Sequence, residues 1–366
     1  MRGATSGLVA VLFMASCEDS CWQDDYTFVW HGQSVTLYAY GYTEGDACGG
    51  SFAELDGHTR MIVDELGVQD HPVSVYRWIS RDFWEQLEDP CAGAFACAWP
   101  GEARSPVLPH MHEVVHTVTA RIGDDGCPRL LDEGLAMVYD APTPTSYLYP
   151  TPEYPLFDLL EVGITAHGLQ YVRAAHFVAF LLEHYGPQSV VQLCEGLPAE
   201  PTLQQWEAAV STTLGTTLDG LLTAYELYPW CTYPQMRARL WGCSGPPDFT
   251  FTAVGDEFVL EAGCEDRQAT NGAWDDAGWD YIGDGLLLRR VAFTQDTWLR
   301  VSANAPGPSG IRPTYSSQEC APCSENPDVF VLNVDEATHF YRAGRYEVAV
   351  YFDKRDPVRL TMTVVE

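Results

Sequence analysis

"PHMHEVVHTVTARIG" occupies residues 109–123, about a third of the way along the chain. His112 and His116 stand four positions apart, so on a helix the two side chains lie on one face, one turn from each other. Two imidazoles at this spacing can share one zinc ion. Glu113 stands beside the pair and can reach a water on the metal without ligating the metal itself.

A second helix is predicted by "PRLLDEGLAMVYD", which occupies residues 128–140. Pro128 suits the first turn of a helix. The apolar positions that give this helix a buried side are Leu130, Leu131, Leu135 and Val138. Glu133 would project from the helix toward the two histidines, and Gly134 would leave room for a close approach between helices.

The two stretches together resemble the gluzincin metallopeptidases, in which His-Glu-x-x-His is followed by a helix carrying Glu-Gly-Leu-Ala or a relative of it. The resemblance rests on "HEVVH" and "DEGLA" and covers roughly residues 34–230. It implies a zincin-like catalytic domain of the α+β class and makes Glu133 the third zinc ligand. The metzincin pattern is excluded, because Thr119 and Ile122 stand where that group carries Gly and His.

A mechanism follows from this ligand set. Three protein ligands leave a fourth zinc position for a water, whose pKa falls to about 7 in such sites. Glu113 would accept the proton of this water and deliver it to the leaving amine. For the oxyanion donor we favour Tyr171, because relatives often place a tyrosine near the start of that helix. Tyr139, His176 and the tyrosines of the loop at residues 140–157 are alternatives.

Carboxylates next to zinc-binding imidazoles usually fix the orientation of the rings. Asp132 and Asp140 are both near enough in sequence for this role, and the sequence does not choose between them. Residues 114–119 are rich in β-branched side chains, which form helices poorly, so tertiary packing must hold the motif helical.

The rest of residues 34–245 predicts a small sheet backed by helices, followed by a mainly helical half. Residues 34–42 and 73–80 have strand patterns, and residues 51–68 have a helical one. A loop holding Cys91 and Cys97 should precede the motif helix. Residues 140–157, rich in proline and tyrosine, should form a long loop such as a lid or a surface excursion.

Residues 246–366 carry short alternating runs separated by turns, which predict an all-β sandwich domain. The segment "FYRAGRYEVAVYF" (340–352) loosely resembles sandwich modules that follow secreted bacterial proteases. The acidic segment "WDDAGWDYIGDG" (274–285) could bind Ca²⁺, although solvated acidic loops are the commoner case.

The first 17 residues have the pattern of an export signal, with Arg2 ahead of a short apolar core. Residues 14–17 resemble a bacterial lipobox, which would make Cys17 a lipidated membrane anchor. Ordinary cleavage near Ser16 and secretion is the alternative. Residues 18–33 should form a tether to the fold. We therefore expect the protein to be exported and either anchored at the cell envelope or secreted.

Twelve cysteines agree with export, because an oxidising compartment lets them pair. If Cys17 is lipidated, eleven remain, so at least one thiol is free or pairs between chains. Local bridges Cys91/Cys97 and Cys231/Cys243 are plausible. Cys320 and Cys323 have zinc-ribbon spacing, but no second such pair exists, so a disulfide role is favoured.

The formal net charge is −31 and the pI is near 4.4, and such a surface repels phosphate backbones, so we expect no nucleic-acid partner. The sequence thus predicts a monomeric zinc peptidase that acts on proteins or peptides. The alternatives are a non-enzymatic, zinc-stabilised surface lipoprotein used for adhesion or envelope interaction, and a metal-dependent hydrolase of non-peptide substrates.

Overall fold

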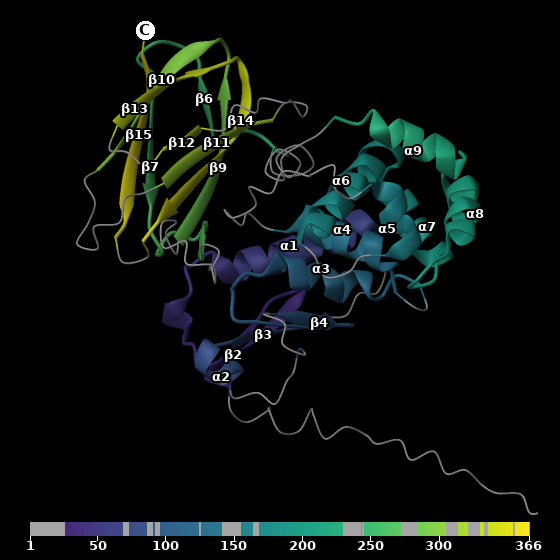
Figure 1. Cartoon of the computed structure of the whole chain (residues 1–366). Helices are drawn as coiled ribbons and strands as arrows, with labels where there is room; N and C mark the ends of the chain where they lie inside the picture. Colours follow the sequence, from purple (N-terminus) through teal and green to yellow (C-terminus); the bar gives the residue numbers. More distant parts are fainter. Residues whose placement is uncertain are drawn as a thin grey trace, which may run out of the picture.

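A computed structural model describes most of the chain. The described residues are 26–68, 73–85, 91, 96–123, 126–140, 155–163, 168–229, 243, 245–271, 285–304, 314–320, 330–332, 336–353 and 356–365. Helices and several β-sheets make up the fold, as the α+β expectation requires. In Figure 1 a small sheet and the helices form one part, and two further sheets form the other.

The small sheet is mixed and has the strand order β1-β2-β3-β5-β4. Its strands are β1 (Phe28–His31), β2 (Val35–Tyr40), β3 (Ser74–Ile79), β4 (Cys97–Trp99) and β5 (Glu102–Ser105). β2, β3 and β5 run parallel, whereas β1 and β4 are antiparallel to their neighbours. Short helices η2 (Glu44–Asp46) and α2 (Arg81–Trp84) lie in the connections.

Two helices cover one face of this sheet, α1 (Ser51–Leu66) and α3 (Met111–Thr119). One core joins Leu37 of β2 and Tyr76 of β3 to Leu55 of α1 and Val114 of α3. β2 and β3 alternate in burial, so each gives one face to this core. The motif helix α3 therefore packs directly against one face of the sheet.

Six more helices form the second half of this part: α4 (Arg129–Tyr139), α5 (Leu156–Val162), α6 (Gly168–Tyr185), α7 (Pro187–Gly196), α8 (Leu203–Leu214) and α9 (Leu218–Glu226). α6 is apolar on most of its surface and packs against α4. Gly134 allows this contact, because a Cβ there would lie 2.5 Å from Val178 Cγ2 and 2.7 Å from the Ala174 carbonyl oxygen. The close approach between helices that is expected at Gly134 is therefore the contact between α4 and α6.

The remaining strands are β6 (Phe249–Phe251), β7 (Glu257–Ala262), β8 (Ala269–Asn271), β9 (Gly285–Phe293), β10 (Thr297–Ala303), β11 (Thr314–Glu319), β12 (Phe330–Leu332), β13 (Glu336–Tyr341), β14 (Gly344–Phe352) and β15 (Val358–Val365). They form two sheets, ordered β13-β10-β15-β7 and β12-β11-β14-β9-β6, with β8 beside β9. Side chains of both sheets share one core, including Leu299 and Met362 from the first and Val291 and Val348 from the second.

Four disulfide bonds join described cysteines: Cys48–Cys264, Cys91–Cys97, Cys127–Cys194 and Cys243–Cys320. Disulfides persist in oxidising compartments, which favours an extracellular location. Within the described part of the chain, no helix has the length and apolar character needed to cross a membrane. The Cys91/Cys97 bridge is confirmed.

The expected Cys231/Cys243 bridge is wrong, because Cys243 pairs with Cys320. Sheet pairing explains the difference. The Arg345 guanidinium on β14 donates to the Cys243 carbonyl at 2.7 Å, and the Cys320 amide donates to the Arg345 carbonyl at 2.8 Å. Both cysteines are therefore held beside one residue, although 77 positions separate them.

Three other expectations need correction. The tether ends before residue 33, because Phe28–His31 is β1 and pairs with β2. The expected loop 140–157 ends before Leu156, where α5 begins. The expected loop around Cys97 contains the β4–β5 hairpin. Cys17 and most of the acidic segment 274–285 lie outside the described residues.

Candidate metal centre

α3 is fixed at its first turn by contacts from two other elements. His110 directly precedes the helix, and its Nδ1 lies 2.8 Å from Ser105 Oγ at the end of β5. Burial lowers the pKa of His110 to about 3, so its ring is neutral near pH 7. Asp140, which follows α4, accepts a hydrogen bond from the His112 amide at 3.3 Å. The position of the motif helix is thus set by the sheet and by α4 together.

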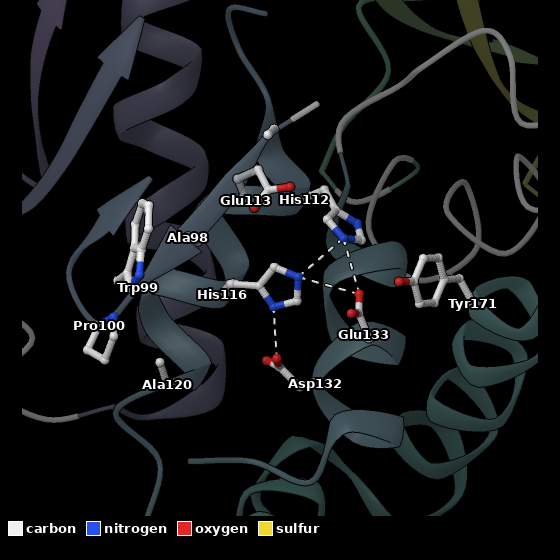
Figure 2. A pocket seen from close by; sticks show the side chains of 11 residues that line it. Ala98, Trp99, Pro100, His112, Glu113, His116, Ala120, Asp132, Glu133 and Tyr171 are labelled. Atoms are coloured by element: carbon white, nitrogen blue, oxygen red, sulfur yellow. Dashed lines mark hydrogen bonds and ion pairs between the residues drawn. The ribbon is translucent and has the colours of Figure 1, made fainter. Parts of the chain in front are cut away.

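Three donor atoms from α3 and α4 face one another (Figure 2). His112 Nε2 and His116 Nε2 are 3.2 Å apart, and they lie 3.3 Å and 3.5 Å from Glu133 Oε2. All three atoms lie within 4.8 Å of one another, close enough to hold one metal ion. The structure therefore brings together the residues that the sequence proposes as ligands.

The burial and hydrogen bonding of Glu133 Oε2 are those expected of an atom that binds a metal ion. This oxygen is buried, and among the described residues it finds no hydrogen-bond partner of good geometry. A buried carboxylate oxygen without a donor is costly, and a cation between it and the two imidazoles would remove that cost. Two imidazoles and one carboxylate are donors that zinc and related divalent ions accept.

Charges at the centre favour a cation in the same place. Burial alone would raise the pKa of Glu133, but His112 and His116 together hold it well below its ordinary value. Burial opposes a charged His116 ring, but Asp132 and Glu133 outweigh that and raise its pKa. The group is thus an ionised carboxylate facing two rings, and a metal ion would take the place of the proton on His116.

Asp132 orients one of the rings. Its Oδ2 lies 2.9 Å from His116 Nδ1, and its Oδ1 accepts a hydrogen bond from the Thr119 hydroxyl. Because Asp132 contacts Nδ1, the opposite ring nitrogen, Nε2, is left to face Glu133. Of the two carboxylates left open by the sequence, Asp132 contacts an imidazole and Asp140 contacts the backbone of His112.

The donor atoms open onto a cavity of about 450 Å³. Glu113 also lines this cavity, and burial raises the pKa of its carboxyl group above the ordinary value. Tyr171 lines it from α6, with its ring centroid 6.5 Å from that of His112. In Figure 2 the Tyr171 hydroxyl points toward Glu133.

Two of the other oxyanion candidates, His176 and Tyr139, lie elsewhere, and the tyrosines of the loop at 140–157 lie outside the described residues. His176 is buried, with Nε2 2.9 Å from the Pro229 carbonyl oxygen and Nδ1 2.9 Å from the Tyr225 hydroxyl. Tyr139 is buried in the helical core, and neither residue lines the cavity. His176 is thus a hydrogen-bonded core histidine.

One wall of the cavity was missed by sequence reasoning. It consists of Ala96, Ala98, Trp99, Pro100 and Ala120. The first four belong to or flank the edge strand β4, which turns into β5 through Pro100 and Gly101. Gly101 has a φ of +85°, as the third position of a type II turn needs. The Pro-Gly pair between Trp99 and Glu102 was the available signal for this hairpin.

Comparisons with known proteins identify no family. No protein-family model matches the chain. No curated protein matches it either. The pre-peptidase C-terminal domain of a collagenase from Bacillus anthracis is 14% identical, over 33% of this chain and 98% of that domain, at a TM-score of 0.20.

Two other solved structures are less similar. A cycloisomaltooligosaccharide glucanotransferase from Paenibacillus sp. is 11% identical over 30% of this chain and 18% of its own, with a TM-score of 0.16. The hydroxypropylphosphonic acid epoxidase from S. wedmorenis is 14% identical over 53% of this chain and 90% of its own, with a TM-score of 0.15.

Proposed function

We propose that this protein is a zinc metallopeptidase of the gluzincin type, with a zincin-like catalytic domain over about residues 34–245 and a β-sandwich domain over 246–366. One observation carries the proposal: the donor atoms of His112, His116 and Glu133 face one another, and Glu113 lines the cavity onto which they open. A scaffold site would need no such carboxylate beside an open cavity.

His112, His116 and Glu133 would hold the ion, and Asp132 keeps the His116 ring in the orientation that this requires. When bound, zinc acidifies water and polarises a substrate carbonyl. Glu113 takes a proton from the attacking water and passes it to the leaving amine. Its raised pKa suits it to both steps, because it lies closer to neutral pH than that of an ordinary carboxyl.

Tyr171 supplies a hydrogen bond to the carbonyl oxygen as charge develops there. Its hydroxyl is directed at the centre from the side opposite Trp99 (Figure 2). Burial raises its pKa, so the hydroxyl keeps its proton near pH 7 and can act as a donor. Substrate would thus lie between α6 and the β4 edge of the sheet.

We further propose that the protein is exported as a lipoprotein anchored through Cys17, and acts on proteins or peptides outside the cytoplasm. The disulfides support an oxidising compartment. Labelling of cells with a fatty-acid analogue, followed by capture of this protein, tests the anchor. The Cys17→Ser variant should lose the label and appear in the soluble fraction.

The function is tested with zinc-loaded protein and a mixed peptide library, reading new termini by mass spectrometry. The wild type should cleave peptides, and Glu113→Gln should bind one equivalent of zinc without cleaving. Chromogenic esters are assayed in parallel. Cleavage of esters alone would favour a non-peptide hydrolase, and zinc binding with no hydrolysis by either protein would favour the adhesion scaffold.

A further inference from the structure

We propose that His58 is a positioning residue of the metal centre, which acts on His112 through the end of α4. This role rests on the proposed function, since it takes His112 as a zinc ligand. His58 lies on α1 and is buried. Its Nε2 donates a hydrogen bond to the Tyr139 carbonyl oxygen, because a carbonyl oxygen can only accept one.

Tyr139 is the last residue of α4, and it is held at two points. Its carbonyl is among the last four of the helix, which have no N–H partner inside the helix. The His58 ring supplies this partner from a neighbouring helix. The Tyr139 ring is buried in the helical core. His58 and the core together therefore fix where α4 ends.

Asp140 transmits this position to α3. It directly follows Tyr139 and is buried, and its carboxylate accepts a hydrogen bond from the His112 amide at 3.3 Å. That amide belongs to the first turn of α3, where N–H groups have no acceptor within the helix. The helix dipole also favours a carboxylate at this end. The place of Asp140 therefore fixes the turn that carries His112.

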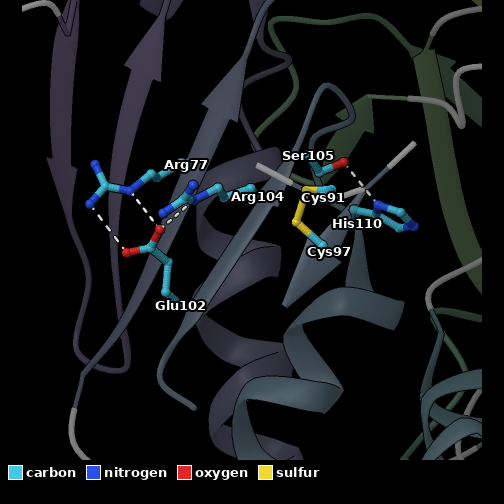
Figure 3. Close-up of a disulfide and its surroundings, with 7 residues drawn as sticks. All are labelled: Arg77, Cys91, Cys97, Glu102, Arg104, Ser105 and His110. Atoms are coloured by element: carbon cyan, nitrogen blue, oxygen red, sulfur yellow. Dashed lines mark hydrogen bonds and ion pairs between the residues drawn. A yellow bond between two sulfur atoms is a disulfide. The ribbon is translucent and has the colours of Figure 1, made fainter. Parts of the chain in front are cut away.

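The residue before α3 does not supply such an acceptor. His110 stands at the N-cap position but makes no side-chain hydrogen bond to the first turn of the helix. Its Nδ1 contacts Ser105 Oγ instead, as Figure 3 shows. The first turn of α3 thus depends on Asp140 for a side-chain acceptor, and Asp140 depends on how the end of α4 is held.

The helix that carries His58 is fixed in its turn by the β-sandwich. α1 begins beside the sandwich (Figure 1), and the Cys48–Cys264 disulfide joins the two parts just before the helix. The Gly50 amide donates to the Ala269 carbonyl at 2.8 Å. A Cβ at Gly50 would lie 2.7 Å from the same oxygen, so the approach is close. His58 thus donates from a helix whose start is anchored.

Zinc affinity by chelator competition tests the role of the ring. His58→Leu should bind zinc about tenfold more weakly, at the lower end of the effect of partners behind metal ligands. His58→Gln should recover most of the affinity, because its side-chain amide can donate to the same carbonyl. With Co²⁺ in place of zinc, the visible absorption bands should shift in His58→Leu and not in His58→Gln. His58→Phe replaces His58→Leu if the latter fails to fold.

A double-mutant cycle tests the route through Asp140. If His58 acts through this residue, His58→Leu should cost nothing further in an Asp140→Ala background. The double variant should then bind zinc as weakly as Asp140→Ala alone. Losses that multiply in the double variant would overturn the route, as would equal affinities of His58→Leu and the wild type.

Asp56 offers a matched control, because it is also a buried polar residue of α1. Its Oδ1 accepts from the amides of Ser34 and Val35 at 2.6 and 3.0 Å, at the start of β2. Asp56→Ala should lower the free energy of unfolding and leave zinc affinity unchanged. A loss of zinc affinity equal to that of His58→Leu would mean general destabilisation and would overturn the positioning role.

Amide hydrogen exchange of the metal-free protein separates this role from the proposed function. The His112 amide should exchange about tenfold faster in His58→Leu than in the wild type or Asp56→Ala. Unchanged exchange in His58→Leu, with peptide cleavage by the wild type, would overturn the role of His58 and leave the function standing. Faster exchange without any cleavage by the wild type would support the role and contradict the peptidase.

Discussion

Asp132 Oδ2 lies 2.9 Å from His116 Nδ1, while the next residue along the chain, Glu133, faces the other nitrogen of the same ring. Consecutive residues on a helix point about 100° apart, so α4 contacts one imidazole at both of its nitrogens. One residue orients the ring and the next completes the group of donor atoms. This places two different roles on adjacent positions of "DEGLA".

Asp132→Asn should weaken metal binding by about 10- to 100-fold, because the neutral amide no longer fixes His116 or increases its basicity. The measurement is zinc affinity by competition with a chromophoric chelator. Asp158→Asn, at an exposed position of α5, is the control and should bind as the wild type does. Equal affinities for both variants would show that the Asp132 contact is dispensable.

Tyr171→Phe should lower kcat about 100-fold and change zinc content little, because the phenyl ring fills the same space without the donor. KM for a peptide should stay near the wild-type value if the hydroxyl acts only on developing charge. Tyr185→Phe, at the other end of α6, provides the comparison. A large rise in KM with unchanged kcat would assign Tyr171 to ground-state binding instead.

Gly134→Ala should destabilise the fold by about 1–3 kcal/mol, because its Cβ would overlap Val178 and the Ala174 carbonyl. Gly57→Ala in α1 is the matched substitution, since a Cβ at Gly57 meets nothing within 4 Å. That change should stabilise by up to about 1 kcal/mol through helix propensity. Urea unfolding of both variants measures the difference. If both substitutions changed the free energy of unfolding in the same direction, this would argue against close packing of α4 on α6.

His176 should make the protein less stable in acid. Burial lowers its pKa from 6.5 to about 4, so the unfolded chain takes up a proton before the folded one does. The contribution of the neutral, buried His176 ring to the free energy of unfolding is fully present above pH 6.5. It is lost as pH falls through about 4, and the total loss is up to roughly 3 kcal/mol. The free energy of unfolding of wild type and His176→Gln is compared from pH 7.5 to 4.

Other groups, including His110, also titrate in acid, so only the difference between the two proteins reports on His176. That difference should shrink as pH falls. A constant difference over the whole range would mean that His176 does not titrate below its ordinary pKa in the folded protein.

The local parts of the candidate site could be predicted from the sequence. Four-residue spacing places His112 and His116 on one face of any helix that contains them, whatever surrounds it. Apolar periodicity likewise predicted α4 and left Glu133 off its most buried side. Both predictions depend only on backbone geometry within a few turns.

The helical state of residues 114–119 could not be predicted from the helix propensity of these residues. Val114, Val115 and Val118 are buried against the sheet or the helical core, and this burial holds the β-branched segment in α3. Burial of apolar area outweighs a weak helix propensity.

Only the tertiary structure decided which distant residues meet. β4 lies beside α3, where Ala98 lines the cavity, because the β4–β5 hairpin pairs at the end of the sheet order. Cys243 meets Cys320 because β14 holds both. Local patterns follow from helix and strand periods, which the chain carries at every position. Contacts between elements depend on packing and on sheet order, which no short stretch of sequence encodes.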